Sequence, residues 1–259
     1  MARRALISYP AGMATITDDA VLPGYAGTRG LNMWEADADL RDVVLPRLTD
    51  RAAAGRFKEF GGQVGGTLGA LIEKSHKPEN LPRLVETRVG GERANAVAYC
   101  AEQIEARRTL ARAIYGQGDL PLVERMTLAV LSNYAGEGGI TCPLAMTEGL
   151  IGLLEKRGTP AQKALLPKLR SDDPAWAVTG GQFVTERQGG SNVSANETSA
   201  KPAADGSWSL TGTKWFCSNP GEAWVATAKI EGKETVGLFL MLRLRPDGTL
   251  NGHKILRKK

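Results

Sequence analysis

The spacing of the apolar residues changes once along this chain, near residue 173. Before that point, apolar residues recur at helical intervals through several long segments. After it, short alternating or β-branched segments are separated by turn dipeptides such as Asp205-Gly206. Helices followed by strands are typical of the α+β class. We therefore expect an N-terminal arm at residues 1–32, an all-α domain at 33–172, and an antiparallel β-sheet or barrel domain, incomplete, at 173–259.

Helix signals are clearest in the middle of the chain. Residues 91–116 are rich in Ala, Glu and Arg and end at Gly116, a residue type favoured just after a helix. Thr159 and Gln162 have the spacing of a capping box around Pro160, which predicts a helix start. The expected helices cover residues 91–116, 122–139, 142–158 and the segment that begins at Thr159.

The glycine-rich segment at residues 61–76 resembles a phosphate loop only in composition. It has no Gly-Lys-Ser/Thr ending, and no apolar strand precedes it. We expect a flexible or closely packed connection there.

The amino-acid composition and charge exclude some classes of protein. With 42% hydrophobic and 24% charged residues, the chain does not have the composition of a disordered protein. The formal net charge is +5, but lysines and arginines are spread along the sequence, so charge alone does not indicate a nucleic-acid partner.

No apolar run reaches transmembrane length, so we expect no membrane partner. Cys100, Cys142 and Cys217 lie far apart without a CxxC pair, which indicates neither a zinc site nor a disulfide and favours a cytoplasmic location.

The stretch "TERQGGSNV", residues 185–193, combines polar side chains with two consecutive glycines where the helical pattern has given way to strands. Glycine lets a ligand approach the backbone, and neighbouring N–H groups beside Thr185 and Ser191 can bind phosphate or a carbonyl-rich ring. The alternative is a solvated loop tip, because Gly, Ser and Asn are common loop residues.

The stretch "TGTKWFCSN", residues 211–219, places two aromatic side chains and Ser218 on an expected strand. A flat ring and a hydroxyl donor suit a flavin, which needs a stacking face and a hydrogen bond to a ring heteroatom. The alternative is a pair of core aromatics with Lys214 in solvent.

Taken together, "TERQGGSNV", "DGSWSLTGTKWFCSN" and the alternating strand after them resemble the acyl-CoA dehydrogenase family, most closely its AidB-like branch. The resemblance is strong from about Gly138 onwards and includes "CPLAMT"; over residues 1–115 it is one of helical character only. It implies a helical domain, a β domain and then a C-terminal four-helix bundle. The chain stops before such a bundle, so it is expected to be truncated.

The resemblance also implies which residues bind the cofactor FAD. Thr185 would hydrogen-bond the flavin ring beside Val184, Phe216 would press on the ring, and Ser218 would reach its reactive nitrogen. Asn192 stands where the family usually has Asp, Phe216 where Trp is frequent, and Gln182 where many members have an aromatic residue. The candidate cofactor-binding residues are Gln182, Val184, Thr185, Gly190, Ser191, Phe216 and Ser218.

The activity that the resemblance implies is α,β-dehydrogenation of an acyl-CoA thioester, by α-proton abstraction and hydride transfer to FAD. The catalytic residue is unknown, since the family's base usually comes from the C-terminal bundle, and Glu186 is expected to be structural. Implied partners are a homo-oligomer and an electron-transfer flavoprotein. The alternatives are an AidB-like flavoprotein with a DNA-binding, alkylation-protection role, or a non-catalytic fragment.

Overall fold

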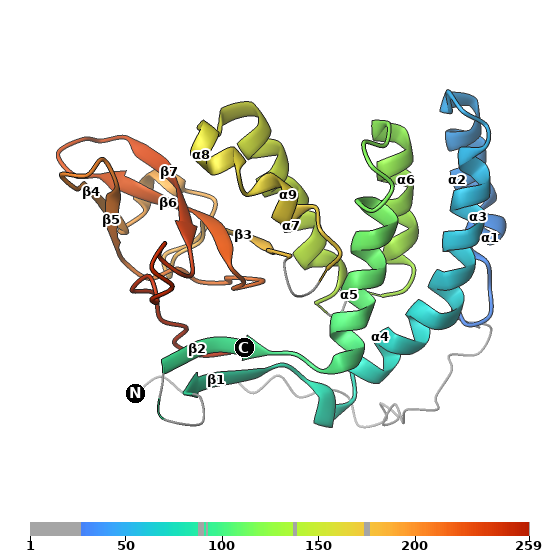
Figure 1. The fold of residues 1–259 in the computed structure, drawn as a ribbon, viewed down its shortest axis with the longest axis horizontal. Coiled ribbons are helices and arrows are strands. Elements are labelled where there is room, and N and C mark those ends of the chain that lie inside the picture. The colour runs from blue at the N-terminus through green and yellow to red at the C-terminus, as the bar shows by residue number, and fades with distance from the viewer. Residues whose placement is uncertain (1–26, 88–90, 92, 137–138, 174–176, 259) are drawn as a thin grey trace, which may run out of the picture.

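The computed structural model describes residues 27–87, 91, 93–136, 139–173 and 177–258. Figure 1 shows upright helices from the N-terminal half at one end, a second helical layer in the middle and a twisted sheet at the other end. This architecture confirms the expected α+β class, with helices first and the larger sheet afterwards. Most of the expected N-terminal arm, residues 1–26, lies outside the described residues.

The helices occupy the segments before residue 170. One expected helix start and one expected helix end are confirmed, since Thr159 makes the capping box with Gln162 and Gly158 follows the end of α7. The helices are α1 (Met33–Ala36), α2 (Ala38–Val44), α3 (Ala53–Gln63), α4 (Gly69–Ser75), α5 (Ala101–Ile114), α6 (Leu122–Asn133), α7 (Thr141–Arg157), α8 (Pro160–Lys163) and α9 (Leu166–Leu169).

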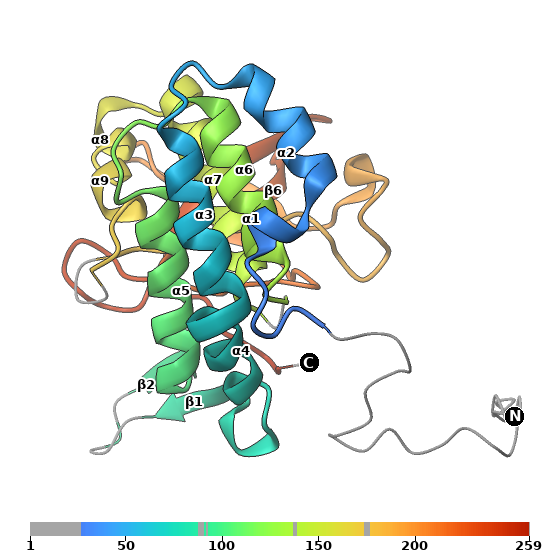
Figure 2. The same ribbon diagram turned by 90° about the vertical axis from the view of Figure 1, so that its right-hand side faces the viewer.

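An apolar core holds helices α1 to α6 together, and Figure 2 looks onto this layer. Phe57 of α3, Leu110 of α5 and Leu128 of α6 are each fully buried in it. Trp34 packs on Phe57 with ring centroids 5.0 Å apart. Each helix therefore buries one apolar stripe against its neighbours, as the sequence periodicity predicts.

The glycine-rich segment is helical and closely packed. Helix α3 continues through a π-helical stretch, Val64–Leu68, into α4. A β-carbon on Gly65 would lie 1.9 Å from the carbonyl oxygen of Leu31, and one on Gly61 would lie 2.6 Å from the backbone nitrogen of Trp34. The glycines let the preceding chain cross the helix surface, which confirms the closely packed alternative rather than a flexible connection.

The expected helix at residues 91–116 is wrong at its beginning. Strand β2 (Arg93–Ala98) pairs antiparallel with β1 (Arg83–Thr87), and α5 begins only after Cys100, its N-cap. Asn95 has a φ of 43° within β2, a conformation that an α-helix cannot contain.

Asn95 also fastens this hairpin to the C-terminal segment. Its Nδ2 donates to the carbonyl of His253 at 2.8 Å, and its Oδ1 accepts from the backbone N–H of Ile255 at 2.9 Å. The Arg243 guanidinium donates to the carbonyl of Ala94 at 2.6 Å. In Figure 1 the end of the chain accordingly lies beside β2.

The larger sheet is mixed, so the expectation of an antiparallel sheet is wrong in part. Parallel pairs arise because the chain makes crossovers between β3, β4 and β6 in place of hairpins. Strands β4–β5 and β6–β7 do pair antiparallel. The strands are β3 (Gly180–Phe183), β4 (Ser199–Pro202), β5 (Trp208–Thr211), β6 (Ala223–Ile230) and β7 (Val236–Leu242).

Strand β6 organises this sheet. Strand β7 pairs with it from Ala223 to Lys229 and occupies one edge. Strands β3 and β4 share the other edge, because β3 ends opposite Ala226 and β4 begins opposite Lys229. The chain between β3 and β4 therefore leaves this edge and returns to it only three residues further along β6.

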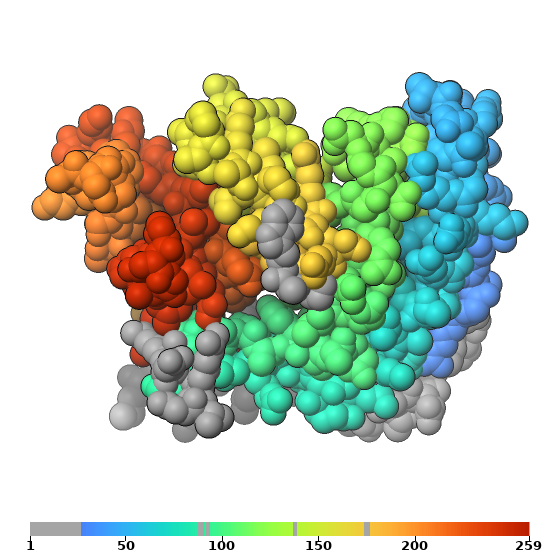
Figure 3. Space-filling view, viewed as in Figure 1, coloured from blue at the N-terminus to red at the C-terminus, as the bar shows by residue number. Residues whose placement is uncertain are grey.

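The two faces of the sheet are covered differently. Leu150 and Ile151 of α7 pack against Ala223 and Val225 on one face. On the other face Phe183 stacks on Trp224, with centroids 5.3 Å apart. The space-filling view in Figure 3 shows the sheet and α7–α9 side by side above the hairpin. Helix α7 thus joins the helical layer to the sheet.

Candidate cofactor-binding site

Two loops with the predicted binding residues lie side by side at the edge of the sheet. We call residues 184–191, which follow β3, the hinge loop, and residues 214–219, which precede β6, the aromatic loop. The backbone N–H of Trp215 donates to the carbonyl of Thr185 at 2.8 Å. At the other end, Nδ2 of Asn219 donates to the carbonyl of Gly180 at 2.7 Å. The sequence predicted that these two segments contribute to one site, and the fold does bring them together.

A buried ion pair lies between the starts of the two loops. Lys214 Nζ is 2.6 Å from Glu186 Oε1, and the two side chains are 9% and 3% exposed. The carboxylate also accepts from the backbone N–H groups of Glu197, at 2.6 Å, and Thr198, at 3.1 Å. The alternative of a solvated Lys214 is therefore wrong.

The protonation of Glu186 follows from these contacts. Burial opposes ionisation of the carboxyl, but hydrogen bonds from Lys214, Thr198 and Glu197 favour the carboxylate more strongly. Burial and these hydrogen bonds together lower the pKa of Glu186 to about 2. The site therefore contains a permanent carboxylate with its hydrogen-bond capacity taken up, which suits a structural role rather than a general base.

Thr227 of β6 completes the polar network where β3 has ended and β4 has not yet begun. Its Oγ1 lies 3.2 Å from Lys214 Nζ and accepts from Nδ2 of the fully buried Asn196 at 2.6 Å. Lys214 Nζ and Thr227 Oγ1 also approach the carbonyl of Val184, each at 3.4 Å. These groups fill the gap in the sheet edge with hydrogen bonds instead of a strand.

Gly190 is required by close approach within the hinge loop. A β-carbon at this position would lie 2.5 Å from Oγ1 of Thr185. The loop therefore folds back onto Thr185, which brings two of the predicted cofactor-binding residues together. Ser191, the next residue, is exposed at the rim.

The aromatic loop presents Phe216 and Ser218 to solvent. Phe216 is 61% exposed and has a φ of 56°, which is rare for a bulky residue. Its ring meets that of Trp215 edge-on, with centroids 5.9 Å apart. The alternative of a core aromatic pair is therefore wrong for Phe216. An exposed ring in a strained backbone is a feature that structures retain at ligand sites.

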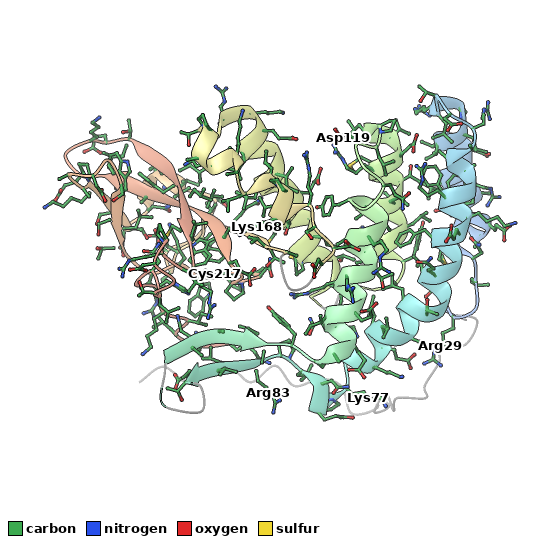
Figure 4. The ribbon with its side chains drawn as sticks, viewed as in Figure 1. Arg29, Lys77, Arg83, Asp119, Lys168 and Cys217 are labelled. Atoms are coloured by element: carbon green, nitrogen blue, oxygen red, sulfur yellow. The ribbon has the colours of Figure 1, made fainter. Side chains whose placement is uncertain are left out.

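Cys217 points the opposite way from its neighbours. It packs against the cluster that contains Phe183 and Trp224, and Figure 4 labels it at the edge of the sheet nearest the hairpin in that view. Burial raises the pKa of the Cys217 thiol to about 11, against the opposing charge of Lys214. The thiol is consequently protonated and unreactive at neutral pH.

Gln182 lies apart from the other predicted residues. It projects from β3 towards α7, where its Nε2 is 3.4 Å from the carbonyl of Met146 and fills the space beside Gly149. Val184 contributes its carbonyl to the polar network described above. All of the predicted set except Gln182 therefore lies in the two neighbouring loops: Val184, Thr185, Gly190, Ser191, Phe216 and Ser218.

The sequence interpretation did not include Lys214, Asn196, Thr227 and Asn219 among the site residues. The strand expected over residues 211–219 is wrong beyond Thr211, where β5 ends, and residues 214–219 form a loop, so no strand alternation could indicate the burial of Lys214. Nothing in the sequence indicated that Asn196 and Thr227 meet, because their contact depends on the crossover between β3 and β4.

Within the described residues, no group of three or more His, Cys, Asp or Glu side chains could hold a metal ion. No helix among those residues has the length and apolar character needed to cross a bilayer.

Curated relatives match this chain over part of their length. Acyl-CoA dehydrogenase family member 11 of Caenorhabditis elegans is 28% identical over 237 residues, which cover 83% of this chain and 38% of the relative. The putative acyl-CoA dehydrogenase AidB of Escherichia coli (strain K12) is 35% identical over 133 residues, or 48% of this chain and 24% of the relative. The chain thus spans less than half the length of the curated relatives it matches, and no family model matches it.

The fold has solved counterparts. The crystal structure of Caenorhabditis elegans ACDH-11 in complex with C11-CoA superposes with a TM-score of 0.75 at 25% identity. The match covers 94% of this chain and 45% of that protein. The superposition therefore extends over both the helical layer and the larger sheet of this chain.

Proposed function

We propose that this chain, which is similar to acyl-CoA dehydrogenases over part of their length, binds FAD with its hinge and aromatic loops and serves the dehydrogenation of an acyl-CoA thioester. Support for the substrate class comes from the names of the relatives and from the C11-CoA bound to ACDH-11. The observation that carries the cofactor proposal is the direct contact between the loops at Thr185 and Trp215.

The residues present fit FAD. Gly190 lets the hinge loop fold back against Oγ1 of Thr185, which brings two candidate residues of this loop together. Thr185 and Ser218 supply hydroxyl donors, and Phe216 supplies an exposed ring for stacking. Ser191, at the rim of the hinge loop, would approach the FAD pyrophosphate or the thioester tail.

When bound, FAD supplies a two-electron acceptor for the hydride that leaves the β carbon of the thioester. The chain's own residues would bind and orient: Thr185 and Ser218 hold hydrogen-bond donors at fixed positions, and Phe216 shields one face from water. Glu186 cannot take the α proton, because Lys214 and two backbone N–H groups occupy its carboxylate. We assign the base to none of the described residues.

A binding titration tests this proposal. We expect the purified chain to quench FAD fluorescence on binding and to retain flavin absorbance through gel filtration. Thr185→Val and Ser218→Ala should each weaken FAD binding by about 3- to 10-fold, the effect of one hydrogen bond. Ser209→Ala, an exposed hydroxyl on β5, is the matched control. A wild-type chain that binds no FAD at micromolar concentration would refute the proposal.

A further inference from the structure

We propose that the Glu186–Lys214 ion pair is a positioning device that sets the spacing between the hinge loop and the aromatic loop for FAD. This inference rests on the proposed function, and it assigns to the pair a role in cofactor geometry beyond that of holding the sheet together.

The pair lies next to the binding residues of both loops. Glu186 directly follows Thr185, and Lys214 is two residues before Phe216 and four before Ser218. The 2.6 Å contact between Glu186 and Lys214 is thus one residue away from the backbone bond between Trp215 and Thr185. A change in the length of this contact would be transmitted directly to the groups that would face the flavin.

Glu186 is a fixed point rather than a mobile partner. Its Oε2 accepts from the N–H of Glu197, and its Oε1 accepts from the N–H of Thr198 and from Lys214. Since β4 begins at Ser199, the carboxylate is tied to the start of a strand of the sheet. Lys214 therefore attaches the aromatic loop to the sheet framework through Glu186.

Lys214 is held in place from more than one side. In addition to Glu186, its ammonium has Thr227 Oγ1 at 3.2 Å and the carbonyl of Val184 at 3.4 Å. An ammonium has three N–H donors, and these three acceptors come from the hinge loop and from β6. The contacts fix the lysine relative to the hinge loop and the central strand together.

A buried pair of this kind is better suited to fixing geometry than to raising stability. Removing two charges from water offsets most of their mutual attraction, so apolar replacements of similar size are often as stable as the pair. Directional hydrogen bonds, in contrast, specify one arrangement of the two loops. Stability and cofactor affinity should therefore respond differently when both charges are removed.

The same sheet offers a matched control in the Lys201–Glu231 pair. Its nitrogen and oxygen are 3.7 Å apart and its side chains are 72% and 59% exposed. It joins β4 to the end of β6, and neither residue belongs to either loop. An exposed pair of this kind should have little influence on either stability or cofactor binding.

The experiment compares five forms of the full chain: wild type, Lys214→Met, the double variant Glu186→Leu/Lys214→Met, Lys214→Arg, and the control Lys201→Met. Each is measured for the melting temperature of the FAD-free protein, the Kd for FAD and the visible circular dichroism of bound flavin. We expect the double variant to melt closer to wild type than Lys214→Met does. We also expect it to bind FAD at least about tenfold more weakly and with an altered dichroism spectrum, because misplaced loops cost affinity.

The Lys214→Arg variant keeps the charge but places it differently, so we expect it to fold and to bind FAD with intermediate affinity and an altered spectrum. If the methionine variants do not fold, the FAD affinity and flavin spectrum of Lys214→Arg test the inference in their place. Wild-type affinity and spectrum in the double variant, or in Lys214→Arg when the double variant is unfolded, would overturn the inference. Those results leave the proposed function intact, whereas absence of FAD binding by the wild type would overturn both.

Discussion

The helical layer and the sheet edge bury different kinds of side chain. In the helical layer the largest fully buried groups are mostly apolar, including Phe57, Leu110 and Leu128. Beside the hinge loop the buried groups are polar, with Glu186 and Asn196 at their centre. Apolar contacts are non-directional and contribute stability roughly in proportion to buried area. Hydrogen bonds contribute less net stability but specify orientation, so the contrast separates the region that stabilises the fold from the region that sets site geometry.

The largest expected effect tests the apolar region. Phe57→Ala removes a fully buried ring that packs on Trp34, and it should lower the free energy of unfolding by about 3–5 kcal/mol. Urea denaturation followed by far-ultraviolet circular dichroism measures this loss. A loss below about 1 kcal/mol would mean that the helical core repacks easily and does not stabilise the fold more than the sheet edge does.

The second prediction concerns the polar region and pH. The pKa of Glu186 in the folded chain is about 2, against an ordinary value of 4.5. Its contribution to stability is therefore fully present above pH 4.5 and is lost as the pH falls towards 2. The loss is on the order of 3 kcal/mol. We expect urea midpoints to fall over this range in wild type and to fall less in Glu186→Gln. If the urea midpoints of wild type and Glu186→Gln fell equally with decreasing pH, the prediction would be wrong.

The third prediction compares two glycines. Gly190→Ala places a methyl group 2.5 Å from Thr185 Oγ1 and should destabilise the chain by about 1–3 kcal/mol. Gly152→Ala, within α7, meets nothing within 4 Å and should stabilise it by about 0.5–1 kcal/mol. Thermal melts of both variants provide the measurement. Similar shifts in the same direction would show that the hinge loop is not closely packed.

The smallest expected effect on stability is at Phe216. Because its ring is 61% exposed, Phe216→Ala should change the free energy of unfolding by less than about 0.5 kcal/mol. FAD affinity should nevertheless fall by about 2- to 10-fold, since the stacking surface is removed. Chemical denaturation and fluorescence titration together check both values. A large loss of stability with unchanged FAD affinity would make Phe216 a packing residue.

Much of the fold could be predicted because helix caps and amphipathic spacing are local. The start at Thr159 and the stop at Gly158 illustrate this, since both depend on neighbours within a few residues. The beginning of the expected helix at 91–116 was wrong because β2 is fixed by pairing with β1 and by Asn95 contacts far along the chain. Composition rich in Ala and Glu could not reveal that tertiary requirement.

For the candidate site, the sequence indicated which segments matter more readily than which atoms meet. Thr185 and Phe216 could be proposed as binding residues because their motifs are contiguous. The buried state of Lys214 could not, because it results from the gap that the crossover leaves opposite Thr227. Parallel pairing of β3 and β4 with β6 is a non-local property that turn signals do not encode.

The hydrogen bonds of Asn95 have a consequence for the order of folding. Their partner His253 lies 158 positions later in the chain, so the hairpin cannot acquire these contacts until nearly all of the described residues have left the ribosome. Contacts of such high sequence separation form slowly, because a long loop must close before they contribute. We therefore expect the helical layer to assemble before the hairpin joins the C-terminal segment.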